Sequence, residues 1–319
     1  MGKDSGGGVR TGVAIIGPGN WGTSLAHALH EARIPVRELI VSRMPARRRS
    51  GGETAVTTLD CANLDAAILW LCVPDSSIAE TARSLVERKK ILASRRPGPA
   101  APRSRLLRGQ IVVHSSGALS AEVLRPAALA GAAVASVHPL MTFPARRPVA
   151  LSDVPFAVEA EEDTRRKLNT ILREVGGRPF PIAGSAKALY HAVGMLASPL
   201  LVSLIAAALE TAGHAGLAPR QARRLLEPIV QTTLKNVFTR GLADSFSGPI
   251  ARGDVTAIDL HLQALMPHPI LADLYRSLAI YALEALPSRN SNEIRRVLER
   301  STSRRGRRTF QPLASNVRD

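Results

Sequence analysis

The sequence predicts an α/β fold, in which a doubly wound parallel sheet is followed by an all-α region. Three observations lead to this prediction. A short apolar run precedes a glycine-rich turn and a helix at residues 13–32, strand and helix patterns then alternate to about residue 183, and only helix patterns follow Gly184. Strand–helix alternation of this kind is typical of a sheet with helices on both faces.

The glycine-rich turn follows four β-prone apolar residues, Val13–Ile16, and precedes a helical pattern at 23–32. Its members are Gly17, Pro18, Gly19, Asn20, Trp21 and Gly22. In this setting Gly17 would permit the tight turn, Gly19 would let a diphosphate approach the backbone, and Gly22 would let the helix pack on its strand. The diphosphate would lie at the helix N-terminus, where unpaired N–H groups favour anions. The alternative is a glycine turn that binds nothing.

The second strand is expected at Val36–Val41, and the residues after it bear on the choice of dinucleotide. An acidic residue at this strand end would bind the ribose 2′-hydroxyl of NAD. Here Ser42 and Arg43 follow instead, with three more arginines at 47–49. A hydroxyl and a guanidinium favour a 2′-phosphate, so the sequence predicts NADP over NAD. An exposed basic loop is the alternative.

A continuous apolar run at 67–73 predicts a central strand that is covered on both faces. Ligands of such sheets bind beyond the carboxyl ends of the strands, so Val73, Pro74 and Asp75 are expected to border the cofactor. Asp75 could equally be a helix-terminal acid, because a capping-box pattern predicts a helix from Ser77 towards Lys90. Residues 91–108, rich in proline and arginine, are expected to form a surface insertion.

Further strands are predicted at 111–113, 133–137, 156–158 and 179–182, with helices at 120–130 and 162–175. Beyond them, residues 185–212 predict one long apolar helix, and 192–209 carry no charge. Such a helix approaches the length of a membrane span. Because Gly194 and Pro199 interrupt it, we expect the buried centre of a bundle or a subunit interface instead. Helices are also expected at 219–240, 254–265 and 269–285.

The start of the long helix carries the residues most suited to proton transfer. Lys187, Tyr190, His191, Gly194 and Ser198 recur every three or four positions, so they share one helix face. Burying a charged stripe in a core is costly, whereas a cleft facing the cofactor would accommodate it. The lysine or the imidazole could then pass a proton to a carbonyl or imine while a nicotinamide passes hydride. A stripe satisfied by polar contacts at a domain interface is the alternative.

The remaining candidates would position a substrate. Two strand ends carry histidines, and a glycine-rich segment interrupts the helical region. The candidate substrate residues are His114, Ser115, Ser116, Gly117, His138, Arg252 and Asp254. Hydroxyls and backbone N–H groups at 114–117 could cradle a carboxylate, and Arg252 could clamp an anion. Structural histidines and a surface turn capped by Asp254 are the alternatives.

Charge and cysteine content limit the classes of function. The net charge is +16, with arginines clustered at 43–49, 95–108 and 295–308. Because no aromatic residues interleave with them, we interpret the excess as solvated surface, and nucleic-acid binding as the lesser alternative. Two cysteines provide no disulfide framework, and no metal site is expected. Residues 1–10 lack the apolar core of a signal peptide, so a cytoplasmic location without a membrane partner is expected.

These observations divide the chain into a flexible segment at 1–10, a dinucleotide-binding domain at 11–183, a helical substrate or dimerisation domain at 184–287, and a basic flexible tail at 288–319. Six motifs occur in order: the glycine turn at 17–22, Val-Pro-Asp at 73–75, His-x-Ser-Gly at 114–117, His-Pro-Leu at 138–140, Tyr-His at 190–191, and Gly-Pro-x-Ala-Arg-Gly-Asp at 248–254.

Together these motifs resemble the Rossmann-like proteins with an uncharacterised C-terminal helical domain, relatives of pyrroline-5-carboxylate reductase and of the phosphogluconate and β-hydroxyacid dehydrogenases. The resemblance spans residues 13–285. It implies an NADP-linked oxidoreductase acting on a small carbonyl, hydroxy or imino compound, and a homodimer formed through the helical domain. Lys187 matches the lysine of the β-hydroxyacid dehydrogenase pattern, and His191 stands where that pattern has asparagine. A dinucleotide-dependent sensor without turnover is the alternative.

Overall fold

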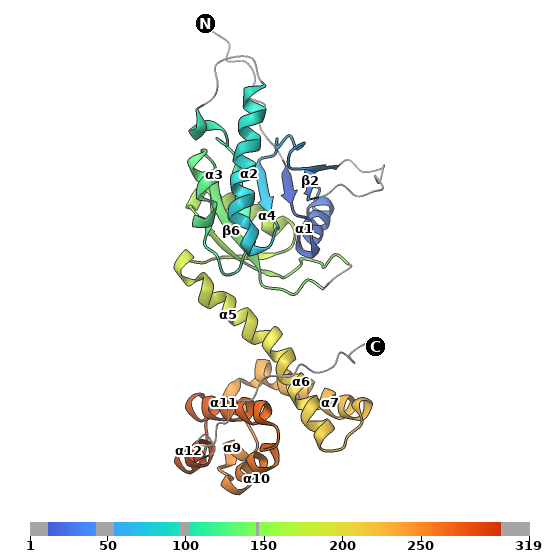
Figure 1. Cartoon of the computed structure of the whole chain (residues 1–319), viewed down its shortest axis with the longest axis vertical. Helices are drawn as coiled ribbons and strands as arrows, with labels where there is room; N and C mark the ends of the chain where they lie inside the picture. The colour runs from blue at the N-terminus through green and yellow to red at the C-terminus, as the bar shows by residue number, and fades with distance from the viewer. Residues whose placement is uncertain (1–11, 43–53, 96–101, 145–146, 301–319) are drawn as a thin grey trace. The chain divides into compact units, whose positions relative to one another are not determined.

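The structure is a computed structural model that describes residues 12–42, 54–95, 102–144 and 147–300. The predicted flexible segment at 1–10 therefore lies outside the described residues. The chain forms two compact units, divided between Leu201 and Val202 (Figure 1). This division lies within the predicted helical domain, and each unit is described below by itself.

The first unit is built on one eight-stranded sheet with the order β3-β2-β1-β4-β5-β6-β7-β8. Its strands are β1 Val13–Ile16, β2 Val36–Val41, β3 Ala55–Thr58, β4 Ile68–Leu71, β5 Ile111–His114, β6 Ala133–Pro139, β7 Pro155–Ala160 and β8 Arg178–Pro181. Every residue of β1, β4 and β5 is buried, which explains their continuous apolar sequences. The strand order reverses between β1 and β4, where doubly wound sheets bind their ligands.

The prediction of a parallel sheet holds for every pair of strands except β6 and β7, which run antiparallel. A parallel return requires a long crossover, usually a helix. The described parts of the β6–β7 connection, 140–144 and 147–154, contain no helix, so the chain turns back directly. Strand β3 was not predicted because its four residues are partly exposed at the edge of the sheet.

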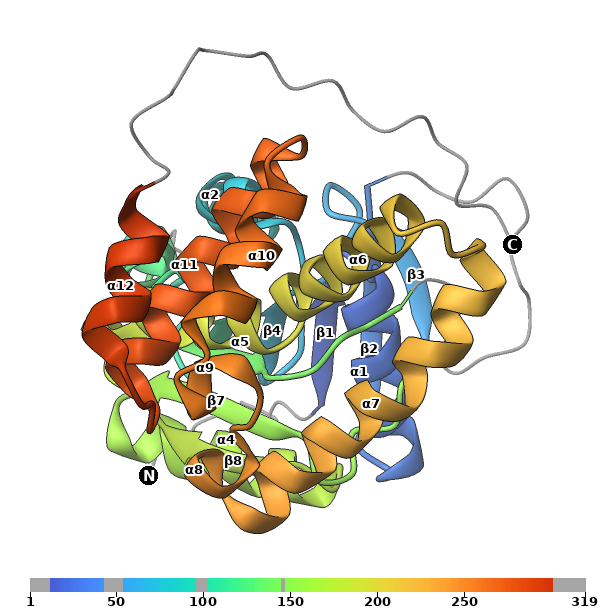
Figure 2. The same ribbon diagram turned by 90° about the horizontal axis from the view of Figure 1, so that it is seen from below.

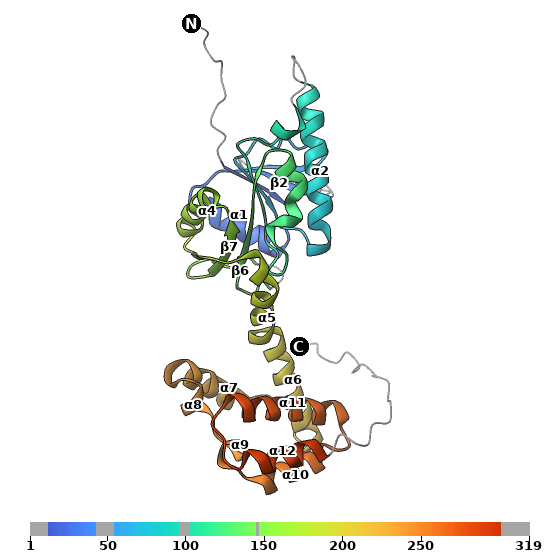
Figure 3. The ribbon, with the colours of Figure 1, turned by 90° about the vertical axis from the view of Figure 1, so that its left-hand side faces the viewer.

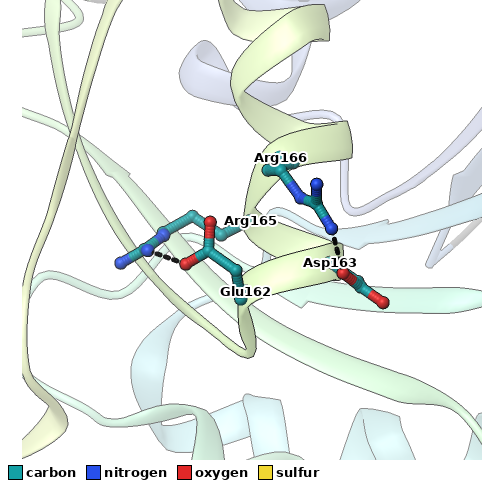
Figure 4. A network of polar contacts seen from close by, with 4 residues as sticks. All are labelled: Glu162, Asp163, Arg165 and Arg166. Carbon is teal, nitrogen blue, oxygen red and sulfur yellow. Dashed lines mark hydrogen bonds and ion pairs between the residues drawn. The ribbon is translucent and has the colours of Figure 1, made fainter.

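Helices cover both faces of the sheet. Figure 3 shows α1 (Asn20–Glu31) and α4 (Glu162–Glu174) on one face, and α2 (Asp75–Ser94) on the other with α3 (Arg125–Leu129). Each layer has its own apolar core: Leu25, Leu29 and Leu168 lie in the first, and Ile78 and Leu85 in the second. The outer side of α4 carries two ion pairs at i,i+3 spacing, Arg165 with Glu162 and Arg166 with Asp163 (Figure 4).

Helix α2 differs from its prediction at both ends. It begins at Asp75, after Pro74, and no side chain caps it, so the capping box expected at Ser77 is not formed. It also extends through Ser94 into the predicted surface insertion. Of that insertion, 96–101 lie outside the described residues, 103–105 form a short 3-10 helix, and Leu107 is fully buried in the core.

The long helix predicted over 185–212 is divided in two. Helix α5 spans Lys187–Ala197 and α6 spans Pro199–His214. The break falls at Ser198, whose backbone is not helical (φ −131°, ψ −78°), immediately before a proline that has no N–H to donate. By length and composition, the segment Gly184–His214 is the one stretch of the described chain apolar enough to cross a membrane.

The second unit is helical, as predicted. It contains α7 Pro219–Arg240, α8 Leu242–Ser245, α9 Pro249–Arg252, α10 Val255–Leu265, α11 Pro269–Ala285 and α12 Ser291–Arg300. Helices α10, α11 and α12 pack together around Ile258, Leu262, Ala279 and Ile294, while α7 lies apart from them (Figure 2). The glycine-rich segment at 248–254, which was predicted to interrupt the helical region, contains α9, a single helical turn.

Helix α12 corrects the prediction of a flexible tail that starts at residue 288. Within the predicted tail, Ile294 and Leu298 of α12 are fully buried against α10 and α11. The rest of that tail, 301–319, lies outside the described residues. The basic residues of α12 therefore project from a packed helix, with Ile294 and Leu298 on its inner face.

We predict that Leu298→Ala destabilises the helical unit by about 2–5 kcal/mol, because it leaves a cavity in a closed core. Arg296→Ala, on the exposed side of the same helix, should change stability by less than about 0.5 kcal/mol. Thermal and urea unfolding of the full chain measure both variants. Equal stabilities for Leu298→Ala and Arg296→Ala would contradict the packing of α12.

Candidate functional site

The glycine turn lies where β1 and β4 end side by side. Gly17 has φ +79°, and a Cβ atom there would lie 2.6 Å from Val73 Cγ1, so only glycine fits this turn. A Cβ on Gly22 would lie 3.1 Å from Cys72 Cβ, so this glycine lets α1 approach the sheet. A Cβ on Gly19 would meet no atom within 4 Å. The three glycines thus have the geometries that their predicted roles require.

Strand β2 ends beside this turn. The Gly17 N–H donates to the Ile40 carbonyl (2.8 Å) near the end of that strand. Ser42 follows on the surface, whereas Arg43 and the arginines at 47–49 lie outside the described residues. The acidic residue of β2, Glu38, is buried, and its carboxylate accepts the N–H groups of Asn63 and Leu64. It is therefore committed to the fold and does not lie at the strand end.

The end of β4 links the glycine turn to the next strand. Val73, Pro74 and Asp75 follow β4, and Asp75 is the first residue of α2. Its Oδ2 accepts a hydrogen bond from Ser116 Oγ (2.7 Å). Asp75 is thus both a helix-terminal acid, the alternative stated above, and a contact of the predicted substrate segment.

The Ser115 hydroxyl is held by two tryptophans. The indole N–H groups of Trp21 and Trp70 both donate to Ser115 Oγ (2.8 Å each). Trp21 also packs its ring near Phe143 and Phe156 within the core. The contacts of Trp21 therefore anchor α1 to the sheet, and its role as a cofactor ligand stays a prediction.

Ser116 and His114 shape the turn after β5. The Ser116 hydroxyl donates to Asp75 and accepts from the N–H groups of Ala118 and Leu119. His114 Nδ1 accepts the Ser116 N–H (3.1 Å), so its proton resides on Nε2 and faces the Ser120 carbonyl (3.1 Å). Burial lowers the pKa of His114 to about 4, and the nearby charge of Lys187 adds to this. The imidazole is therefore neutral at physiological pH.

The predicted polar face of α5 meets the ends of β5 and β6. Lys187 Nζ donates to the Ser116 carbonyl (2.9 Å). The Tyr190 hydroxyl shares a hydrogen bond with His138 Nδ1 (3.0 Å), and the His138 and His191 rings pack edge to face with centroids 5.6 Å apart. Gly194, the next member of this face, approaches Leu140.

These imidazoles lie over Gly117. A Cβ there would lie 2.4 Å from His191 Cδ2 and 2.8 Å from His138 Nε2, so the missing side chain makes room for both rings. Gly117 therefore has a packing role in the structure, and its predicted role in substrate binding stays a prediction.

Burial sets the protonation of the pair formed by His138 and Tyr190. It lowers the pKa of His138 to about 4, with Lys187 and His191 contributing, and it raises the pKa of Tyr190 to about 12. Both groups are neutral at pH 7. The phenol therefore retains a proton that it can donate.

Two residues of this network were missed by the sequence analysis. Ser136 Oγ, in the buried middle of β6, accepts from Lys187 Nζ (2.7 Å). Glu159, on β7, accepts the Ala121 N–H, and its charge acts on Lys187. A buried serine within an apolar strand was the only available signal for Ser136, and the antiparallel pairing that brings Glu159 here is not a local property.

Arg252 and Asp254 belong to the second unit. Asp254 accepts the Ala257 N–H (3.0 Å) and caps α10, as expected, while Arg252 is exposed at the end of α9. An apolar groove of about 670 Å³ lies within this unit, between α6, α10 and α11. At its wall the rings of His214 and His268 stack 3.6 Å apart.

Comparison with known families divides the chain in the same order as the fold. Residues 3–139 match a Rossmann-like domain, and residues 154–282 match a domain of unknown function, DUF2520. The search of curated proteins found no match.

Solved structures share this fold at low sequence identity. Protein BF3122 of Bacteroides fragilis, assigned as an NADP oxidoreductase, has 22% identity and a TM-score of 0.65, covering 90% of this chain and 98% of its own. A Plasmodium falciparum pyrroline carboxylate reductase with NADP bound has 15% identity and a TM-score of 0.53, covering 91% and 99%. A reductive aminase of Aspergillus terreus in complex with NADPH and ethyl levulinate has 16% identity and a TM-score of 0.58, and the match covers 89% of this chain and 98% of the aminase. At these low identities, it is the TM-scores that establish a common fold.

The neutral His114 predicts a pH dependence of stability. Its pKa falls from 6.5 in the unfolded chain to about 4 in the fold, so the unfolded chain binds the proton first. Stability should therefore fall as the pH drops from 6.5 to 4, by up to about 3 kcal/mol from this group, and should not change on its account above pH 7. Urea unfolding at several pH values measures this.

His114→Gln keeps a polar head but removes the titrating group, so its stability should depend less on pH over the same range. If the variant and the wild type lose stability in parallel on acidification, His114 is not the buried neutral group described here.

Proposed function

Because the chain joins a Rossmann-like domain to a DUF2520 domain, we propose that it is an NADP-dependent oxidoreductase. Its substrate would be a small, anionic carbonyl, hydroxy or imino compound. The geometry of the glycine turn carries this proposal: Gly17 and Gly22 are required by packing, whereas the space beside Gly19 is open. The likeness to structures that hold NADP or NADPH supports the choice of cofactor.

The residues of the turn fit a dinucleotide. No side chain caps the first turn of α1, and that turn contains no acidic residue, so its N–H groups would receive the diphosphate of NADP. The open side of Gly19 would allow the close approach. Ser42 and Arg43 would bind the 2′-phosphate, and Val73 and Pro74 would border the cofactor.

The chemistry would need one hydride and one proton, added together across a C=O or C=N bond or removed in the reverse direction. The nicotinamide would supply or accept the hydride, so that NADPH becomes NADP⁺ in the direction of reduction. The proton would come from the polar face of α5, where Tyr190 and His191 lie beside His138. The backbone of Ser116 and Gly117 would position an anionic substrate, and the substrate role predicted for Arg252, in the helical unit, stays a prediction.

The open space at Gly19 gives a direct test of cofactor binding. Gly19→Ala should alter the stability of the free protein by less than about 1 kcal/mol, because the added methyl group meets no atom. It should weaken NADPH binding at least about tenfold, since the methyl occupies the path of the diphosphate. Calorimetry of NADPH binding and thermal unfolding measure the two effects.

Gly213→Ala is the matched control, because a Cβ there also meets no atom within 4 Å but lies in the helical unit. It should bind NADPH as the wild type does. Wild-type protein that does not bind NADPH, or Gly19→Ala protein that binds it unchanged, would refute the cofactor site.

We also propose a homodimer that uses the α5–α6 segment. The face of α5 opposite Lys187 carries Leu189, Val193 and Leu196 at i, i+4 and i+7, and Leu189 and Leu196 are 77% and 66% exposed. No residue of α6 is buried. A helix that is apolar all round needs cover, and a second copy with the same surface would provide it.

The cytoplasmic location also stays a proposal.

Light scattering tests the dimer. The wild type should have twice the chain mass of 34.0 kDa, and Leu189→Glu with Leu196→Glu should shift it to the monomer. Leu129→Glu, at an equally exposed leucine on α3, should remain dimeric. A wild type that stays at 34.0 kDa at micromolar concentration would disprove the assembly.

A further inference from the structure

Lys187 is the one fully buried lysine among the described residues, and its ammonium group is held by hydrogen bonds within the protein. Its side chain is 0% exposed, although it begins a helix whose other residues are not buried. The ammonium donates to the Ser116 carbonyl (2.9 Å) and to Ser136 Oγ (2.7 Å). A buried charge persists only when such partners satisfy it.

One acceptor of Lys187 lies directly after a strand, and the other lies within the neighbouring strand. Ser116 follows β5 and Ser136 is in β6, and the Ser136 hydroxyl also donates to the Ser116 carbonyl (3.3 Å). Through its own hydroxyl, Ser116 reaches Asp75 at the end of β4. The ammonium is therefore one member of a network that joins the residues after β4 and β5, and the middle of β6, to the start of α5.

We infer that Lys187 is a positioning residue: its ammonium group fixes the Ser116–Gly117 turn to β6, and other groups carry the proton of the reaction. This inference rests on the proposed function. Lys187 acts through Ser116, whose turn supports the His138 and His191 rings over Gly117. Tyr190, hydrogen-bonded to His138, keeps its phenol proton at neutral pH and is the group that we propose as the donor.

The charge of Lys187 has a second effect on the same turn. The titratable groups that act on it or respond to it are Asp75, His114, His138 and Glu159. Burial lowers the pKa of Lys187, and Glu159 and Asp75 oppose this, so the carboxylates favour a charged ammonium. The ammonium in turn lowers the pKa of His114 and of His138. It thus adds to the effect of burial, which is the larger cause of the lowered pKa of both imidazoles.

Nuclear magnetic resonance of ¹³C-labelled histidine tests this inference without a known substrate. In Lys187→Met, a side chain of similar length without charge, the pKa of His114 and His138 should rise by roughly one unit, because a nearby positive charge is gone. In Lys187→Arg the charge stays, so both histidines should titrate as in the wild type. Unchanged titration in Lys187→Met would overturn the inference.

Ser136→Ala provides a second measurement if Lys187→Met does not fold. It removes one acceptor but leaves the charge, so the amide signals of Ser116 and Gly117 should shift while the histidine pKa values stay. Unchanged amide signals would also overturn the inference. Calorimetry of NADPH binding to the same proteins tests the proposed function separately, because the cofactor turn contains neither Lys187 nor Ser136.

Once a substrate is found, the pH profile of turnover separates positioning from proton donation. Lys187→Met should lower kcat but keep the alkaline limb of the profile, whereas Tyr190→Phe should abolish turnover and leave NADPH affinity unchanged. Loss of the alkaline limb in Lys187→Met would assign the proton to the lysine and overturn the inference.

Discussion

The close approach of β1 and β4 at their carboxyl ends is the constraint on which this structure depends. Glycine is required at 17 and at 22 because Val73 and Cys72 of the neighbouring strand end fill the space where their side chains would lie. The same contact places the first turn of α1 beside the crevice where the strand order reverses. Of the three glycines in the turn, Gly19 is the one that faces open space.

A network of hydrogen bonds connects this edge of the sheet to helix α5. Asp75, Ser116, Ser136 and Lys187 connect the residues after β4 and β5, and the middle of β6, to α5 within one unit. Interior charges and hydroxyls are costly unless each finds a partner, so such a network defines one arrangement of the turn. His191 of α5 and His138 of β6 then lie over Gly117.

The sequence was sufficient to predict a structural feature wherever that feature depends on neighbouring residues of the chain. Spacing alone predicted the tight turn at Gly17 and the close helix packing at Gly22, and helical periodicity placed Lys187, Tyr190 and His191 on one face. Non-local features could not be predicted: Ser136 contacts Lys187 from β6, and Glu159 acts on it because β7 pairs antiparallel with β6. Pro199 was recognised as an interruption although one helix was predicted over 185–212, and basic composition concealed the buried side of α12.

A crystal structure of the protein grown with NADPH tests the central claim most directly. The account predicts the diphosphate over the open side of Gly19, against the N–H groups of the first turn of α1, with the 2′-phosphate beside Ser42. Density for the dinucleotide elsewhere on the molecule, or a side chain filling the turn in its place, would contradict it.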